Sequence, residues 1–291
     1  MRIHWPHIEA MLDATAARTI VEIGAGGGAT TRLLLEWAHA HDAVVHVVDP
    51  TPNLDFDKTV ADNPDRVVCH RATSFDALPS LPVPELVCLD GDHNWYTVYN
   101  ELKLIDESAQ GADRPFPLTL MHDIGWPYGR RDQYYDPSRI PEEFRQAWSG
   151  TAGMFPGRKN LVEGRGYNRG VKQALVEGGE RNGVLTAAED YVQDCERALR
   201  LETVAGGNGL AVIADEATLQ SNSALRDAMD HLVSPEFLAA HCWQLDELAN
   251  KYMAARAVDR QEIARLESRL KDMERLAEEA AVAAPSAEEF A

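Results

Sequence analysis

Short apolar runs recur between Thr19 and Met121, and their alternation with amphipathic segments constrains the fold more than any other feature. Five runs have the composition of buried strands: Thr19–Ile23, Ala43–Val48, Arg66–Cys69, Leu86–Leu89 and Leu118–Met121. Helical periodicity is present at 4–17, from Thr30 onward and at Tyr96–Ile105. Strands that alternate with helices form a parallel sheet with both faces covered. We therefore expect an α/β fold with a doubly wound sheet.

Two more strands are expected in the last third of the chain. The apolar runs Leu201–Ala205 and Leu210–Ala214 are separated by Gly-Gly-Asn-Gly, a strong hairpin signal. The hairpin would complete a seven-stranded sheet with an antiparallel edge. Before it, residues 124–186 form an insert rich in glycine, proline and aromatic side chains, with short helical pieces such as Pro141–Trp148. The pattern returns to helix at Ala187–Leu199.

Only helical pattern is visible over residues 223–291, so we expect a domain over 1–222 followed by a C-terminal helical extension. Part of the extension has the spacing of a heptad seam, at Ile263, Leu266, Leu270, Met273 and Ala277. The seam is short and shifts register near Val258–Asp259. A helix packed back on the domain and a homodimer through residues 245–280 therefore both fit. We expect Ala280–Ala291 to be disordered.

The chain is acidic, with 28 Lys and Arg against 47 Asp and Glu in 291 residues and a formal net charge of −19. Nucleic-acid binders need a cationic face, and anionic membranes repel such a chain, so neither partner is expected. The four cysteines form no CxxC pair, which argues against disulfides or a zinc site. The N-terminus is too polar for a signal peptide, and no run approaches the ~20 apolar residues of a membrane span. We expect a cytoplasmic protein.

A glycine-rich turn follows the first predicted strand and precedes a helix. The turn contains Gly24, Gly26 and Gly28, and an acid, Glu22, precedes it. Glycines let the backbone approach a ligand, and the helix N-terminus offers unpaired N–H groups. Asp49 ends the next strand, where a carboxylate can accept hydrogen bonds from both hydroxyls of a ribose. The pattern predicts a nucleoside site, and a purely structural tight turn is the alternative.

The run Glu-x-Gly-x-Gly-x-Gly resembles the first motif of class I S-adenosylmethionine-dependent methyltransferases, and the terminal hairpin is similar to theirs. A dinucleotide enzyme would prefer Gly-x-Gly-x-x-Gly, whereas Ala29 stands at the last position of that motif here. The resemblance covers roughly residues 15–215 and implies a Rossmann-like sheet with S-adenosylmethionine as cofactor. It implies that Glu22 helps to anchor the ammonium group and that Ser74 contacts the adenine. An ordinary serine in a turn is the alternative for Ser74.

Two acidic residues end neighbouring strands of the predicted sheet. Asp90 follows the fourth strand and Asp123 the fifth, so their carboxylates converge at its carboxyl edge. Adjacent carboxylates repel each other unless a cation lies between them, and Mg²⁺ prefers such oxygen ligands. The metal could lower the pKa of an acceptor hydroxyl. His93, three residues after Asp90, could take the proton of that hydroxyl.

The stretch Leu89-Asp-Gly-Asp-His-Asn-Trp-Tyr resembles the macrolide-sugar and cephalosporin-hydroxylase-like O-methyltransferases, and more distantly the catechol and caffeoyl-CoA enzymes. The resemblance implies that Asp90 and Asp123 are metal ligands and His93 the base. Catechol-type enzymes have an asparagine ligand where this chain has Ile124, so a third ligand must come from His122, Asp92, another side chain or water.

Structural roles remain open for three residues of this carboxylate site. Asp90 could cap the next helix or contact the cofactor. His93 could be a structural residue bonded to Asp123. His122 could be packed at a strand end.

The insert differs from the rest of the chain in charge. Residues 124–172 contain nine Lys and Arg against five Asp and Glu, together with eight aromatic residues. Long irregular segments at the carboxyl edge often cover an active site. We expect Trp126, Tyr128, Arg130 and Arg131 to form an acceptor lid that attracts an anionic sugar or ring. The alternative is that the arginines pair with the acidic body of the protein.

The pattern as a whole predicts an S-adenosylmethionine-dependent O-methyltransferase for a small molecule of bacterial specialised metabolism, such as antibiotic biosynthesis. Mg²⁺ would assist, and His93 would act as general base. One alternative is a metal-independent N- or C-methyltransferase. A second is a non-enzymatic, oligomerising protein that binds a partner.

Overall fold

The computed structural model describes residues 1–283 and separates them into two units. The first runs from Met1 to Ser234, and the second begins at Pro235. Helix α8, Ser223–Leu232, lies in the first unit, whereas its sequence suggested that it begins the extension. It packs on helix α1, Trp5–Thr15, and its Leu225, Met229 and Leu232 are buried. Because the apolar face of α8 packs within the first unit, this unit ends at Ser234 and not at residue 222 as expected.

The first unit is built on a seven-stranded sheet with the order β11-β12-β5-β4-β1-β2-β3. The strands are β1 Thr19–Ile23, β2 Val44–Val48, β3 Val67–His70, β4 Leu86–Leu89, β5 Leu118–His122, β11 Leu199–Val204 and β12 Leu210–Asp215. Strands β1 to β5 pair in parallel, while β12 runs antiparallel to both β5 and β11. The predicted Rossmann-like sheet with a terminal hairpin is confirmed.

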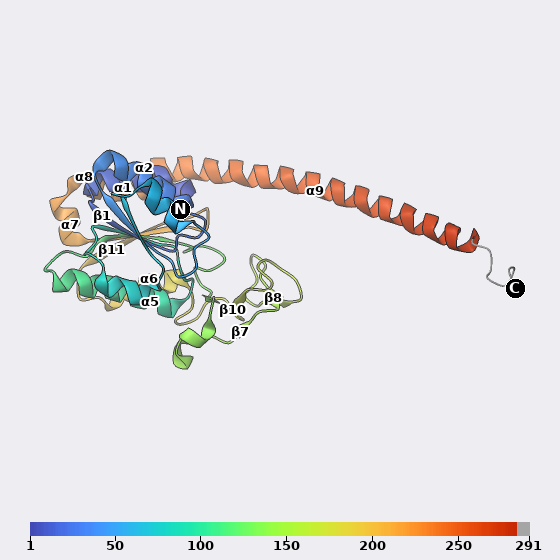
Figure 1. Ribbon diagram of the computed structural model, residues 1–291, viewed down its shortest axis with the longest axis horizontal. Helices are drawn as coiled ribbons and strands as arrows, with labels where there is room; N and C mark the ends of the chain where they lie inside the picture. Colours follow the sequence, from blue (N-terminus) through green and yellow to red (C-terminus); the bar gives the residue numbers. More distant parts are fainter. Residues whose placement is uncertain (284–291) are drawn as a thin grey trace. The chain divides into compact units, whose positions relative to one another are not determined.

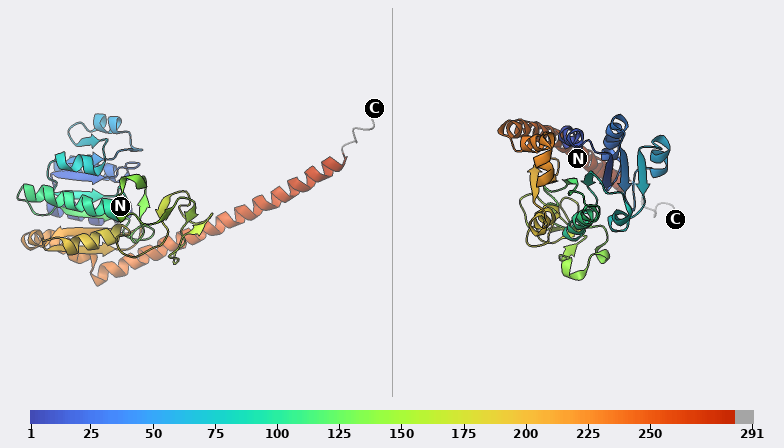
Figure 2. Two further views of the ribbon diagram at one scale, coloured as in Figure 1. Left: turned by 90° about the horizontal axis from the view of Figure 1, so that it is seen from below. Right: turned by 90° about the vertical axis from the view of Figure 1, so that its left-hand side faces the viewer.

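Helices cover both faces of this sheet. Helices α1 and α2 (Ala29–His41) lie on one face, and α5 (Trp95–Gly111) and α6 (Val184–Asp194) lie on the other (Figures 1 and 2). The short helices are α3 Phe56–Asp62, α4 Ser74–Ala77 and α7 Glu216–Ser221, with 3-10 turns η1 Arg2–His4 and η2 Leu78–Ser80. Helix α5 begins at Trp95 because Asn94 accepts a hydrogen bond from the Thr97 amide at 2.9 Å.

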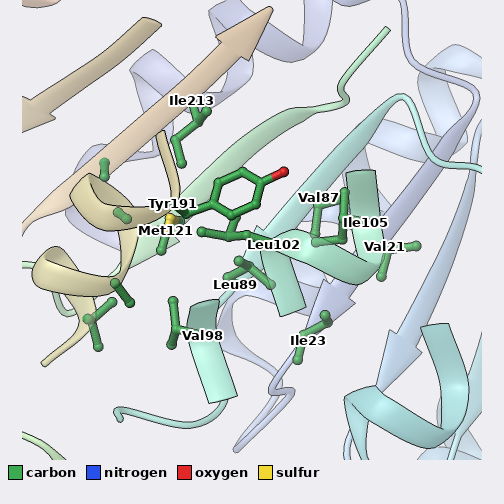
Figure 3. Packing of buried hydrophobic residues seen from close by; sticks show 14 of the residues in the cluster. Val21, Ile23, Val87, Leu89, Val98, Leu102, Ile105, Met121, Tyr191 and Ile213 are labelled. Carbon is green, nitrogen blue, oxygen red and sulfur yellow. The ribbon is translucent and has the colours of Figure 1, made fainter. Parts of the chain in front are cut away.

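The core between the sheet and α5 follows from helical spacing. Val98, Leu102 and Ile105 recur on one face of α5 and are at most 2% exposed. They pack against the β1 and β4 side chains that point to the same face, including Val21 and Leu89 (Figure 3). This packing fixes the carboxyl ends of β1 and β4 relative to the start of α5, where the candidate site residues lie.

The insert folds into small antiparallel sheets at the carboxyl edge. One sheet has the order β6-β10-β7 and the other pairs β8 with β9. Their bounds are β6 Gln133–Tyr134, β7 Trp148–Ser149, β8 Ala152–Gly153, β9 Val162–Glu163 and β10 Lys172–Ala174, with 3-10 turns η3 Pro137–Arg139 and η4 Glu142–Phe144.

The helix expected over Pro141–Trp148 is therefore wrong except for the single turn η4. The chain extends after Arg145 so that Trp148 can pair with Ala174 in the sheet. Helix α6 also differs from its expected range, because it begins at Val184 and ends at Asp194.

The second unit consists of one helix, α9, over Pro235–Ala283. Residues 280–283 are helical although they were expected to be disordered, and the remainder of that predicted tail lies outside the described residues. Within residues 1–283, no helix is both long enough and apolar enough to cross a membrane.

Candidate active site

The turn between β1 and α2 passes close to the end of β4. Gly24 has φ +90°, and a Cβ there would lie 2.2 Å from the carbonyl oxygen of Asp90. Only glycine allows this approach. A Cβ added at Gly26 or Gly27 would meet no atom within 4 Å. The turn is therefore open at Gly26 and Gly27, while at Gly24 it contacts the backbone that follows β4.

Asp49 holds this turn from the end of β2. Its Oδ2 accepts hydrogen bonds from the amides of Ala25 at 3.0 Å and Gly26 at 3.1 Å, and its Oδ1 accepts from Thr51 at 2.8 Å. The sequence suggested that this carboxylate accepts from a ribose. In the structure it anchors the glycine-rich backbone and also lines the adjacent cleft. The remaining lone pairs are the ones open to a ligand.

Glu22 lies beneath the turn and is 1% exposed. Its Oε2 accepts a hydrogen bond from the Thr31 hydroxyl at 2.6 Å, while its Oε1 has no partner among the described residues. Burial raises the pKa of this carboxyl to about 8. Glu22 was expected to help to anchor the ammonium group of the cofactor. It lies behind the turn and does not line the cleft.

A cleft of about 490 Å³ opens beside the turn. Several residues predicted to bind the cofactor line it, namely Gly24, Gly26, Asp49 and Ser74, together with Asp90. Gly28 does not; it has φ +74° and caps α2. The insert contributes Tyr135, Asp136 and Arg139 to the opposite wall. The fold therefore joins the glycine-rich turn and the insert in one cavity.

Glu101 on α5 also lines this cleft and was missed by the sequence analysis. It is 2% exposed, and burial raises the pKa of its carboxyl to about 8, although a hydrogen bond from Ser74 acts in the opposite direction. An acidic residue on the apolar face of a predicted helix, three residues after Val98, was the available signal. Burial of such a carboxyl group beside a cavity is a typical feature of ligand sites.

Asp90, His93 and Asp123 meet at the carboxyl edge, with one possible ligand atom from each within 4.8 Å of the others. His93 Nε2 lies 2.8 Å from Asp123 Oδ2. Burial alone would lower the pKa of His93, but the hydrogen bond to Asp123 and its charge outweigh burial and raise it. The predicted base and both predicted carboxylates are thus brought together.

His122 lies between the two carboxylates. Its Nδ1 is 3.1 Å from Asp123 Oδ2 and 3.3 Å from Asp90 Oδ1, and its Nε2 is 2.8 Å from the carbonyl oxygen of Gly207. Burial opposes its charge, but the hydrogen bonds to Asp123 and Asp90 prevail and raise the pKa of His122 to about 9. The imidazolium of His122 is therefore a cation that offsets the two acids.

Asp123 is surrounded by donors. Burial would raise the pKa of Asp123, but the hydrogen bonds from His122 and His93 hold it well below its usual range. Its Oδ1 accepts from the Asn208 side chain at 2.7 Å. An asparagine from the hairpin turn therefore reaches this carboxylate, while Ile124, which stands at the position of the family's asparagine ligand, is buried in the core.

The insert fixes His93 from its other side. The amide of Gln133 donates to the carbonyl oxygen of His93 at 2.9 Å, and Gln133 Oε1 lies 3.2 Å from His93 Nδ1. The neighbouring Asp132 is fully buried and accepts from the amides of Trp95 at 2.8 Å and Gly183 at 2.7 Å. Asp132 thereby ties the insert to the start of α5. Neither residue carries a recognisable sequence signal.

The four expected lid residues have different surroundings. The Tyr128 ring centroid lies 5.2 Å from that of His93, and Trp126 packs against Tyr167 at 5.3 Å. Arg130 forms two hydrogen bonds with Glu189 on α6, at 2.5 and 2.7 Å.

Arg131 is fully buried and donates to the carbonyl oxygens of Ala174 and Lys159. Neither Arg130 nor Arg131 lines the cleft. Arg130 pairs with Glu189 outside the insert, as the alternative interpretation stated, whereas the partners of Arg131 belong to the insert itself. Arg139, which the lid hypothesis did not include, is the arginine on the cleft wall.

Residues 21–123 match a protein family described as a methyltransferase domain. No curated protein matches the chain. Solved structures with a similar fold include an S-adenosylhomocysteine-bound methyltransferase from Podospora anserina, at 13% identity and a TM-score of 0.43, covering 72% of this chain and 77% of that one. The O-methyltransferase TomG from Streptomyces achromogenes has 13% identity and a TM-score of 0.41, with coverages of 72% and 79%. An O-methyltransferase from Bacillus cereus has 12% identity and a TM-score of 0.42, with coverages of 72% and 80%.

The family match spans the chain from β1 to the end of β5. It includes the glycine-rich turn, Asp49, Asp90, His93 and Asp123. The strand order of the sheet, with its antiparallel final strand, agrees with the Rossmann-like fold expected from the sequence. Residues 21–123 of the chain thus match a methyltransferase domain.

Proposed function

We propose that the chain is an S-adenosylmethionine-dependent O-methyltransferase acting on a hydroxyl group of a small molecule. One observation carries the proposal: the His93–Asp123 pair meets Asp90 at the carboxyl edge, and Asp90, unlike His93 and Asp123, lines the cleft beside the glycine-rich turn. Gly24 and Asp90 are in backbone contact, so a cofactor on the turn would lie next to a group able to accept a proton.

The cleft fits S-adenosylmethionine in size and charge. Its volume of about 490 Å³ is in the usual range for cofactor sites. Acidic side chains line it at Asp49, Asp90 and Asp92, and they suit a ligand with a sulfonium and an ammonium group. Glu101 also lines it, as a carboxyl group whose pKa is raised to about 8. The open surface at Gly26 and Gly27 leaves room for the ligand.

His93 is the proposed base. Its Nε2 bonds Asp123, which would stabilise the positive charge gained with a proton. Its ring centroid lies 6.3 Å from that of Tyr135, a residue of the cleft wall, so the acceptor would approach from the insert. The acceptor oxygen would form a bond to the methyl carbon as the carbon–sulfur bond breaks, and the hydroxyl proton would go to Nδ1 of neutral His93 in place of the contact of Nδ1 with Gln133. Positioning contributes much of the acceleration.

The donor set also fits Mg²⁺. Carboxylate oxygens of Asp90 and Asp123 lie within 4.8 Å of each other and of a His93 nitrogen, and hard divalent cations prefer such oxygens. Asp90 and Asp123 would hold the metal, and a bound metal would supply Lewis acidity to the acceptor oxygen.

A second candidate, a metal-independent N- or C-methyltransferase, is favoured by one observation. The imidazolium of His122 already lies between Asp90 and Asp123 and offsets their charge. Activity that survives exhaustive chelation would support this candidate and reject the metal-assisted one.

Arg139 supports an anionic acceptor. It lines the cleft, and its guanidinium group forms no hydrogen bond or ion pair within residues 1–283, whereas the other charged residues that line the cleft are acids. A carboxylate or phosphate on a sugar or ring would neutralise it. Acceptors of this kind occur among specialised metabolites, which we propose as the substrate class.

Calorimetry with S-adenosylhomocysteine and a chelation assay test the proposal together. We expect micromolar binding to the full chain, and methyl transfer to hydroxylated acceptors that EDTA abolishes and Mg²⁺ restores. Absence of binding would favour the third possibility, a partner-binding protein without activity. Arg139→Gln should raise the KM of anionic acceptors while leaving that of neutral analogues unchanged, and equal effects on both would reject the anionic class.

A further inference from the structure

Helix α9 carries one continuous heptad seam, uncharged at ten of its twelve positions, rather than two seams that differ in register. The residues Leu238, Cys242, Leu245, Ala249, Tyr252, Arg256, Asp259, Ile263, Leu266, Leu270, Met273 and Ala277 follow each other at alternating spacings of four and three. Leu248 and Ala255 then lie at flanking positions, and the apparent shift near Val258–Asp259 disappears. The only charged residues of this seam are Arg256 and Asp259.

The seam is exposed along most of its length. Exposure of the large apolar side chains is 69% at Tyr252, 54% at Ile263, 49% at Leu266, 56% at Leu270 and 64% at Met273. At ~1.5 Å per residue the seam is roughly 60 Å long. An exposed apolar surface of this extent is unusual for a helix without a partner. Heptad spacing over six turns or more is typical of a helix that pairs with another helix.

We propose that α9 pairs with α9 of a second copy of this chain in an antiparallel coiled coil whose twofold axis passes between Ala257 and Val258. This axis sets Arg256 opposite the partner's Asp259 and, by symmetry, Asp259 opposite the partner's Arg256. Neither side chain forms an ion pair or hydrogen bond within the described residues, although the two residues lie three positions apart on one helix. Antiparallel pairing therefore gives each charge a partner of opposite sign.

Side-chain size supports the same axis. Leu266 faces the partner's Ala249, and Leu238 faces the partner's Ala277, so a large residue meets a small one in each layer. Leu270 faces the partner's Leu245, and Ile263 faces the partner's Tyr252. The whole seam from Leu238 to Ala277 is matched without an unpaired layer.

A parallel pair would be worse in these same layers. It would place Arg256 against the partner's Arg256 and Asp259 against the partner's Asp259, and it would leave two layers with alanine on alanine. Like charges and voids at a helix seam destabilise the pair. Charge and size complementarity thus select a second copy in antiparallel orientation as the occupant of the seam.

Disulfide trapping tests the orientation with the full chain. The antiparallel axis sets Met273 opposite the partner's Cys242, and Cys242 is exposed. Met273→Cys should give a covalent dimer on mild oxidation, whereas wild type should not. The double variant Met273→Cys with Cys242→Ser and the off-seam variant Lys271→Cys should both stay uncrosslinked. A wild-type dimer linked through Cys242 would overturn the proposal, because it requires a parallel pair.

Charge exchange gives an independent test by analytical ultracentrifugation. Arg256→Asp should weaken the dimer at least about tenfold, and so should Asp259→Arg, because each creates two like-charge contacts. The double variant Arg256→Asp with Asp259→Arg should restore wild-type affinity. A chain that is monomeric at tens of micromolar, or single variants that dimerise like wild type, would overturn the proposal. Circular dichroism shows whether each variant keeps its helix.

Discussion

His93 Nε2 lies 2.8 Å from Asp123 Oδ2, and this contact joins residues thirty positions apart in the chain. It couples the start of α5 to the end of β5, so a change at either residue alters the same group.

Replacement of His93 separates a chemical role from a structural one. His93→Ala should lower kcat by about 10²–10⁴-fold while the affinity for S-adenosylhomocysteine changes less than about threefold. Steady-state kinetics measures kcat, and calorimetry measures the affinity for S-adenosylhomocysteine. His39→Gln, at an exposed histidine of α2, is the control and should change neither. A parallel loss of kcat and affinity in His93→Ala would mean that the residue is structural.

The glycine-rich turn offers a matched pair of variants. Gly24→Ala should lower thermal stability by roughly 1–3 kcal/mol and weaken cofactor binding at least tenfold, because the new Cβ meets the Asp90 carbonyl and φ is +90°. Gly27→Ala meets no atom and should keep wild-type stability. Differential scanning calorimetry checks both. Equal stability of the two variants would contradict the contact seen at Gly24.

Glu22 should make stability depend on pH. Its pKa is about 8 in the folded chain against an ordinary 4.5, so between these values the unfolded chain releases a proton that the folded chain retains. The free energy of unfolding should therefore fall as pH rises through this window, by up to roughly 1.4 kcal/mol per pH unit.

Glu22→Gln should remove the contribution of Glu22 to this slope, while that of Glu101, whose pKa is also about 8, remains. The free energy of unfolding of the variant should therefore rise relative to that of wild type from pH 5 to pH 8. Denaturant titrations at several pH values measure the difference. The exposed Glu9→Gln is the matched control and should keep the wild-type slope. A constant difference between Glu22→Gln and wild type would refute the inferred protonation state.

Substitutions of the two neighbouring arginines of the insert should lower the free energy of unfolding by different amounts. Arg131→Met removes the donor to the buried carbonyl oxygen of Ala174 and the ion-pair partner of Glu177, so it should cost about 3–5 kcal/mol. Arg130→Gln breaks a partly exposed pair with Glu189 and should cost less than about 1 kcal/mol. Urea titrations would detect the contrast. Neither change should act specifically on acceptor KM.

Local sequence signals were sufficient for the sheet and for the ends of its strands. The expected bounds of β1 and β4 agree with the structure, those of β2 and β5 differ by one residue at one end, and those of β3 differ by one residue at each end. Apolar runs and turn residues act over a few neighbouring positions, so they are legible in a single sequence. The acids that follow β2, β4 and β5 were found for the same reason, since parallel strands must end at one edge.

The structure of the insert and the boundary of the first unit were harder to predict from the sequence. The segment around Pro141–Trp148 has helical spacing, yet it extends because Trp148 pairs with Ala174, a residue far along the chain. Arg130 and Arg131 were expected at the acceptor, but one meets Glu189 and the other is buried among carbonyl oxygens. The sequence shows which residues are charged, but it carries no information on which distant group each charged side chain contacts in the folded chain.

The sequence by itself determined the order of strands and helices, the glycine-rich turn and the pair of acids at the carboxyl edge, because these depend on local patterning and on the geometry of parallel strands. Only the tertiary structure decided what lies between those acids. It placed the His122 imidazolium between Asp90 and Asp123, brought Gln133 to His93 and put Glu101 on the cleft wall. Each of these contacts depends on side-chain direction across elements distant in the chain, which close packing of the whole domain sets.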